Sequence, residues 1–102
     1  MATRGPQRRL QVQVEDETGQ HLASATCFFS AWTDEASGER RWRGFLSFIE
    51  PPGSVGPGAY RIRLPSGGVA VIAVSEQRTE GTREQAVFVG QGLPPSLEEE
   101  TG

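Results

Sequence analysis

The side chains best suited to nucleophilic chemistry are the single cysteine and the single histidine of this chain, Cys27 and His21. A cysteine–histidine pair requires the imidazole within hydrogen-bond distance of the thiol, because the base must take the thiol proton. The two residues lie six positions apart in a segment with strand character, which corresponds to about 20 Å at about 3.3 Å per residue. The sequence therefore predicts no catalytic pair. We expect Cys27 to be a small core residue and His21 to be exposed beside a turn.

Metal and phosphate chemistry lack the residue patterns that they need. A structural zinc site takes four ligands, more than one Cys and one His supply. The glycine-rich pieces at 53–56 and 90–92 have neither a following helix nor the lysine of a phosphate-binding loop. No acidic cluster has the spacing of a calcium loop; these clusters are Glu15-Asp16-Glu17, Asp34-Glu35 and Glu98-Glu99-Glu100. We expect no cofactor, no metal, no small-molecule ligand and no enzymatic activity.

Length and charge restrict the remaining possibilities. A chain of 102 residues forms one domain with one core. Its net charge of −3 disfavours a general nucleic-acid-binding protein, because affinity for the phosphate backbone needs a basic surface. The lone cysteine and the absence of a signal-peptide-like apolar run near the start predict a cytoplasmic location. No segment has the roughly twenty apolar residues that a membrane-spanning helix needs.

The clearest structural pattern is a hairpin over residues 59–74. Pro65 suits the second position of a type I turn, and Gly67 can adopt the left-handed conformation that closes a three-residue loop. Partners in an antiparallel pair step in opposite directions from the turn, which fixes the register. The predicted opposite pairs are Leu64 and Gly68, Arg63 and Val69, Ile62 and Ala70, Arg61 and Val71, and Tyr60 and Ile72.

The two faces of this hairpin differ in character because side chains alternate along a strand. One face is apolar and is predicted to be core: Tyr60, Ile62, Leu64, Ala70, Ile72 and Val74. The other face mixes arginine with aliphatic side chains: Arg61, Arg63, Val69, Val71 and Ala73. Arginine stems can lie over aliphatic groups. The second face is therefore a candidate interaction surface.

The other strands are predicted from apolar alternation and from the turn residues between them. These strands cover Leu10–Val14, Leu22–Trp32, Arg41–Ile49 and Ala86–Val89. We expect residues 50–58, which are rich in Pro and Gly, to form an ordered turn, and residues 77–84 to form a mobile polar loop.

The strand over residues 41–49 allows two registers. Simple alternation buries Trp42, Gly44, Leu46 and Phe48 and places Phe45 and Ile49 on the opposite side. A bulge at Gly44 would shift this pattern by one residue. We adopt the register without a bulge.

Six strands without helical periodicity predict an all-β antiparallel domain, and a closed or partly open barrel is our first choice. Several strands are apolar on both sides, and closure removes exposed sheet edges. The alternative is a β-sandwich. Asp16, Gly19, Leu22 and Ala25, followed later by Pro57-Gly58-Ala59-Tyr60, loosely resemble prealbumin-like or carboxypeptidase-regulatory repeats, and this resemblance implies a prealbumin-like or immunoglobulin-like sandwich. The long segment from Asp34 to Phe45 departs from the compact spacing of those repeats.

The domain organisation and function follow as expectations. We expect residues 1–7 to be a flexible arm, 8–95 a single β-domain and 96–102 an acidic flexible tail. The favoured function is that of a protein-interaction module or assembly subunit that binds another protein or a second copy. Its candidate residues, besides the arginine–aliphatic face, are Phe28, Trp32 and Trp42. The alternative is a barrel that binds single-stranded nucleic acid through Arg40-Arg41-Trp42-Arg43 and Phe45, with bases on rings and guanidinium groups on phosphates.

Overall fold

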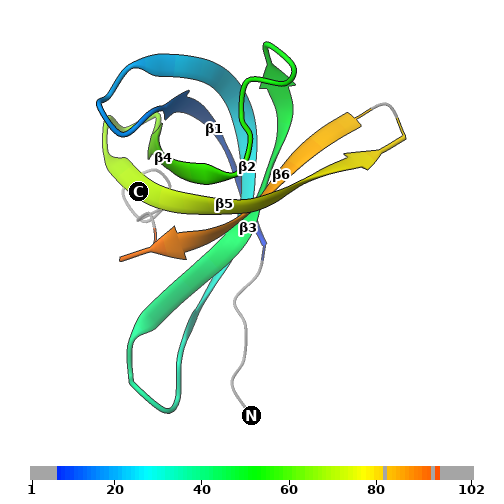
Figure 1. Cartoon of the computed structure of the whole chain (residues 1–102). Coiled ribbons are helices and arrows are strands. Elements are labelled where there is room, and N and C mark those ends of the chain that lie inside the picture. Colours follow the sequence, from blue (N-terminus) through cyan, green and yellow to red (C-terminus); the bar gives the residue numbers. More distant parts are fainter. Residues whose placement is uncertain (1–6, 82, 93, 95–102) are drawn as a thin grey trace.

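The structure is a computed structural model and describes residues 7–81, 83–92 and 94. Six antiparallel strands make up this part of the chain (Figure 1): β1 (Arg8–Glu15), β2 (His21–Thr33), β3 (Arg40–Glu50), β4 (Gly58–Arg63), β5 (Val69–Glu80) and β6 (Arg83–Gln91). Apart from Gln7, the predicted N-terminal arm lies outside the described residues, and so does the predicted acidic tail. No helix in the described part is long and apolar enough to cross a membrane.

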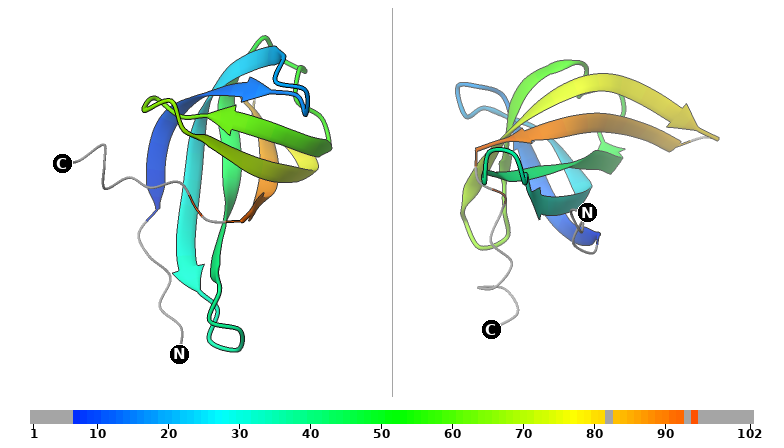
Figure 2. Two further views of the ribbon diagram at one scale, coloured as in Figure 1. Left: turned by 90° about the vertical axis from the view of Figure 1, so that its left-hand side faces the viewer. Right: turned by 90° about the horizontal axis from the view of Figure 1, so that it is seen from below.

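All six strands belong to one sheet that closes on itself as a barrel, in the order β1-β2-β3-β6-β5-β4. The ring closes where β4 pairs with β1 through Gln13 opposite Arg63 and Val14 opposite Ile62. Figure 2 shows the curved sheet from two further directions. The barrel prediction is confirmed, and the sandwich alternative is wrong because one continuous sheet contains every strand.

The β4–β5 hairpin has the predicted register in every pair, from Arg63 opposite Val69 to Tyr60 opposite Ile72. Two backbone hydrogen bonds close the turn over Pro65-Ser66-Gly67. The N–H of Gly67 donates to the carbonyl of Leu64 at 2.8 Å, and the N–H of Leu64 donates to the carbonyl of Gly68 at 2.8 Å. Gly67 has a φ of 96°, the left-handed conformation that glycine adopts without steric cost.

The core fills the barrel with inward side chains, most of which come from alternate positions along the strands. Its members include Val12 and Val14 of β1, Ala25, Cys27 and Phe29 of β2, Trp42 and Leu46 of β3, Ile62 of β4, Ile72 of β5 and Phe88 of β6. Trp42 packs edge-on against Phe29 and Phe88, with ring centroids 5.6 and 5.5 Å apart. Such edge-to-face packing between large rings stabilises this end of the barrel.

The predicted alternation of β3 fails at its end. Pairing with β2 shifts by one residue between Ser24 and Thr26, and Phe48 has a positive φ of 53°. This bulge leaves Phe48 51% exposed and turns Ile49 inward with 5% exposure, which is the reverse of the predicted burial. Phe45 lies on the outer face as predicted, stacked on Phe28.

The segment over 77–84 is not a loop, contrary to the prediction. Most of it lies in a hairpin arm in which β5 continues to Glu80 and β6 starts at Arg83, with Arg78 opposite Gln85 and Thr79 opposite Glu84. Figure 1 shows this arm extending beyond the barrel wall, and the β2–β3 hairpin extends in another direction. The prediction failed because residues 77–79 of β5 are polar and exposed, so that no apolar alternation marks the strand.

The turn over residues 50–58 has the defined shape that was predicted. Val55 is fully buried, and the side chain of Gln77 donates to its carbonyl at 2.8 Å. The hydroxyl of Tyr60 donates to the carbonyl of Gly56 at 2.7 Å and accepts from the N–H of Gly56 at 3.1 Å. These contacts attach the turn to the strands beside it.

Candidate interaction surfaces

The outer surface of β5 and β6 carries an apolar patch, which we call the valine face: Val69, Val71, Ala73 and Val89. Val69 and Val71 are each 40% exposed, and Val89 is 54% exposed. Ala73 lies opposite Val89 in the β5–β6 pairing, so that the patch is continuous across two neighbouring strands. The sequence predicted its β5 half. Val89 was not predicted to belong to this patch. All four residues of Ala86-Val87-Phe88-Val89 are apolar, so both faces of this strand are apolar, and this pattern could have indicated an exposed valine.

Two arginines lie on opposite sides of the valine face. Arg43 of β3 pairs with Val89, and Arg61 of β4 pairs with Val71. No described carboxylate lies within ion-pair distance of either guanidinium group. The face therefore has an apolar centre and a cation at each side.

Arg63, which was predicted to belong to the same surface, is engaged elsewhere. Its Nε donates to Oε2 of Glu15 at 2.8 Å and its Nη2 donates to Oε1 at 3.3 Å. This two-point contact lowers the pKa of Glu15 and raises the pKa of Arg63. Arg63 thus fastens β4 to β1 and contributes little free charge to the surface.

The residues predicted to form an aromatic surface on β2 and β3 do not all lie on the outside of the barrel. Phe28 and Phe45 stack on the outer face with ring centroids 5.0 Å apart. The guanidinium group of Arg43 lies 5.5 Å from the centroid of the Trp32 ring, a cation–π contact. Trp42 is 1% exposed and belongs to the core, so it is not a surface residue. It turns inward because β3 alternates regularly up to Leu46.

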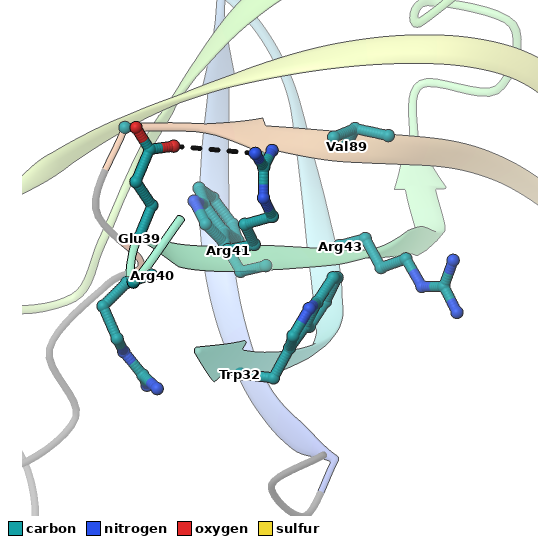
Figure 3. Close-up of a pocket in the computed structure, with 10 residues that line it drawn as sticks. Trp32, Glu39, Arg40, Arg41, Arg43 and Val89 are labelled. Carbon is teal, nitrogen blue, oxygen red and sulfur yellow. Dashed lines mark ion pairs between the residues drawn. The ribbon is translucent and has the colours of Figure 1, made fainter. Parts of the chain in front are cut away.

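A cleft of about 680 Å³ opens where β3 and β6 separate, and we call it the β3–β6 cleft. It is lined by Trp32, Gly38, Glu39, Arg40, Arg41, Trp42, Arg43, Val89, Gly90 and Gly92. Figure 3 shows the charged side chains of β3 with Trp32 of β2 and Val89 of β6. Val89 belongs to the valine face and Arg43 borders it, and both also line the cleft. The valine face and the region around Trp32 are therefore connected through β6.

Arg41 is neutralised within this region. It contacts Asp34 at 2.8 Å and Glu39 at 3.6 Å, and Figure 3 marks the ion pair with Glu39. Asp34 also accepts the N–H of Ala36 at 2.9 Å, and this bond together with Arg41 lowers the pKa of Asp34. With Trp42 inside the barrel and Arg41 paired, the Arg40–Phe45 strand offers nucleic acid fewer exposed contacts than its sequence suggests.

The two residues with nucleophilic potential lie along one unbroken strand, β2. Cys27 is buried, and burial raises the pKa of its thiol to about 12, a value that disfavours the reactive thiolate. His21 is exposed, with Nε2 2.7 Å from the side-chain oxygen of Gln13. Within the described residues, no three His, Cys, Asp or Glu side chains gather as metal ligands.

Comparison with known proteins adds no functional information to this geometry. No family model, no curated protein and no solved structure matches this chain. The outer surfaces and the β3–β6 cleft are therefore the features on which a functional proposal must rest.

Proposed function

We propose that this domain is a protein-interaction module that binds its partner through the valine face. The single observation that supports the proposal is the exposure of Val71 and Val89, 40% and 54% respectively, on neighbouring strands. A continuous apolar area on a sheet surface favours association, because its burial removes apolar surface from water.

The flanking arginines indicate what kind of partner fits. Arg43 and Arg61 lie on opposite sides of the apolar centre, as the strand register requires. A partner with apolar side chains between two acidic groups matches this pattern, and arginine is enriched where interfaces are strong. The partner class is therefore a protein surface with an apolar centre and an acidic rim.

The substitution Val71→Glu tests the proposal. The side chain points outward, so we expect the circular dichroism spectrum and the urea midpoint to stay close to those of the wild type. We expect partner capture, or self-association measured by light scattering, to fall at least tenfold, because a carboxylate then occupies the centre of the apolar face.

The matched control is Gln20→Glu, which adds the same charge in the β1–β2 turn, where the residue is exposed. It should leave association unchanged. If Val71→Glu unfolds the protein, the face belongs to the core and the proposal is wrong. If association is the same in both variants and the wild type, the valine face is ordinary surface.

A further inference from the structure

The β3–β6 cleft contains the place where the closed sheet loses its continuous pairing. Pairing of β3 with β6 covers Arg43 to Leu46 and ends at Arg43 opposite Val89. However, β3 starts at Arg40 and β6 continues to Gln91. Within the described residues, no partner strand lies between these two strand ends, so both present unpaired backbone groups to the cleft. An unpaired strand edge is a template for an added strand.

The charges that border the cleft favour an acidic occupant. The carboxylates of Asp34 and Glu39 contact Arg41. Arg40 donates to the hydroxyl of Thr33 at 3.0 Å, and Arg43 lies over Trp32. No described carboxylate lies within ion-pair distance of Arg40 or Arg43, so these two cations can pair with carboxylates from outside the chain.

The floor of the cleft holds a hydrogen-bond donor without an acceptor. The indole Nε1 of Trp42 is buried and has no hydrogen-bond partner in the described structure. Gly90 and Gly92 line the same cleft, and their missing side chains leave the backbone of β6 open beside the ring. A buried donor that lacks an acceptor is unfavourable.

We propose that the β3–β6 cleft binds an extended acidic peptide segment of a partner protein, which adds as a strand to the free edge of β3. Its backbone pairs with residues 40–42. Arg40 and Arg43 are three positions apart on β3 and extend from opposite faces of the strand, so one carboxylate of the peptide contacts Arg40 on one face and a second, three positions away, contacts Arg43 on the other. A peptide oxygen at the floor supplies the acceptor that Trp42 lacks. Strand addition obtains affinity from the backbone and specificity from alternate side chains. This inference rests on the proposed function as a protein-interaction module but uses a site that does not include Val71.

The test uses a fluorescein-labelled peptide of sequence Glu-Val-Val-Glu with blocked ends, whose two carboxylates extend from opposite faces of a strand, at about 0.15 M salt, where long-range charge effects are screened. Binding is measured by anisotropy and by intrinsic tryptophan fluorescence. The second readout is specific, because both tryptophans of the chain line the cleft. We expect saturable binding and a shifted tryptophan emission, with no binding of the matched Gln-Val-Val-Gln peptide.

Two further comparisons separate strand addition from simple charge attraction. Methylation of alternate backbone amides of the peptide should weaken binding at least tenfold if strand pairing occurs. The double variant Arg40→Gln with Arg43→Gln should also bind at least tenfold more weakly. The control Arg78→Gln, which changes an arginine outside the cleft lining, should bind as the wild type does.

Three outcomes would overturn the inference: no binding of the acidic peptide, equal binding of the methylated peptide, or equal binding by the double arginine variant. Val71→Glu distinguishes this inference from the proposed function. It should retain peptide binding while it loses association through the valine face. If peptide binding fails but Val71→Glu still abolishes partner capture, the interaction function stands and the cleft is not its peptide site.

Discussion

Gly90 of β6 lies directly against the indole ring of Trp42. A Cβ atom at position 90 would fall 1.9 Å from Cε2 and 2.3 Å from Nε1 of that ring. Real side chains do not approach so closely, so only glycine at position 90 allows the ring to occupy this part of the barrel. The same contact keeps Trp42 buried at the floor of the β3–β6 cleft.

The substitution Gly90→Ala should therefore destabilise the fold. The added methyl group must displace a large ring that already packs against Phe29 and Phe88, and such overpacking costs about 1–3 kcal/mol. Urea unfolding followed by circular dichroism measures the change. Gly56→Ala is the control, because nothing lies within 4 Å of its Cβ position. Equal stability of the two variants would contradict the described position of the ring.

The bulge at the end of β3 gives a second prediction, on the stability of variants at the neighbouring residues Phe48 and Ile49. Ile49→Ala should cost about 2–5 kcal/mol, because it removes buried side-chain volume. Phe48→Ala should cost less than about 1 kcal/mol, since Phe48 is half exposed. The free energy of unfolding of the two variants checks this order. The reverse order would mean that β3 alternates without a bulge.

The sequence predicted those parts of the fold that depend on local chemistry. The β4–β5 register follows from Pro65 and Gly67, whose backbone preferences select one turn. The bulge at Phe48 depends instead on how the end of β3 pairs with the start of β2, far from the turn that joins the two strands. The alternative of a bulge at Gly44 was not adopted, and the pairing is regular at that position, with Gly44 opposite Phe29. A Cβ atom there would lie 1.8 Å from the carbonyl oxygen of Phe28, so the glycine allows a close approach of two strands.

The candidate surfaces were predictable only as separate pieces. The hairpin register placed Val69 and Val71 on an outer face, and the structure agrees. Val89 lies between these two valines and Arg43 because the strand order is β3-β6-β5. In this order β3 and β6 are neighbours although they are not consecutive in sequence. The β3–β6 cleft depends on where these two strands stop pairing. No local pattern in the sequence contains that information.

The hydroxyl of Tyr60 gives a third prediction, on the turn over residues 50–58. Tyr60→Phe removes both hydrogen bonds to Gly56 while it keeps the ring. We expect a loss of about 1–3 kcal/mol, because the polar backbone groups of a part-buried glycine lose their partner. Urea unfolding measures this loss, and faster amide exchange at Gly56 should accompany it. Unchanged exchange at Gly56 would show that other contacts hold the turn.

The contact between Glu15 and Arg63 gives a fourth prediction, on pH dependence. Hydrogen bonding and charge from Arg63 hold the pKa of Glu15 below its ordinary value of 4.5. A carboxyl group whose pKa is lower in the folded state stabilises the fold above the unfolded-state pKa, and this contribution is lost as the pH falls through the folded-state value. The wild type should therefore lose stability as the pH decreases from above 4.5 to below the lowered pKa of Glu15.

Glu15→Gln should remove this part of the pH dependence. Its urea midpoint should fall less steeply with decreasing pH than that of the wild type, so that the two curves converge in acid. A smaller slope remains, because the pKa values of Asp16 and Asp34 are also lowered in the fold. Asp34→Asn serves as the control. It should remove the part of the pH dependence of stability that comes from Asp34, so the effects of Asp34→Asn and Glu15→Gln on the slope should add in the double variant. Parallel curves for the wild type and Glu15→Gln would show that the Glu15–Arg63 contact does not lower this pKa, and that other contacts connect β4 to β1.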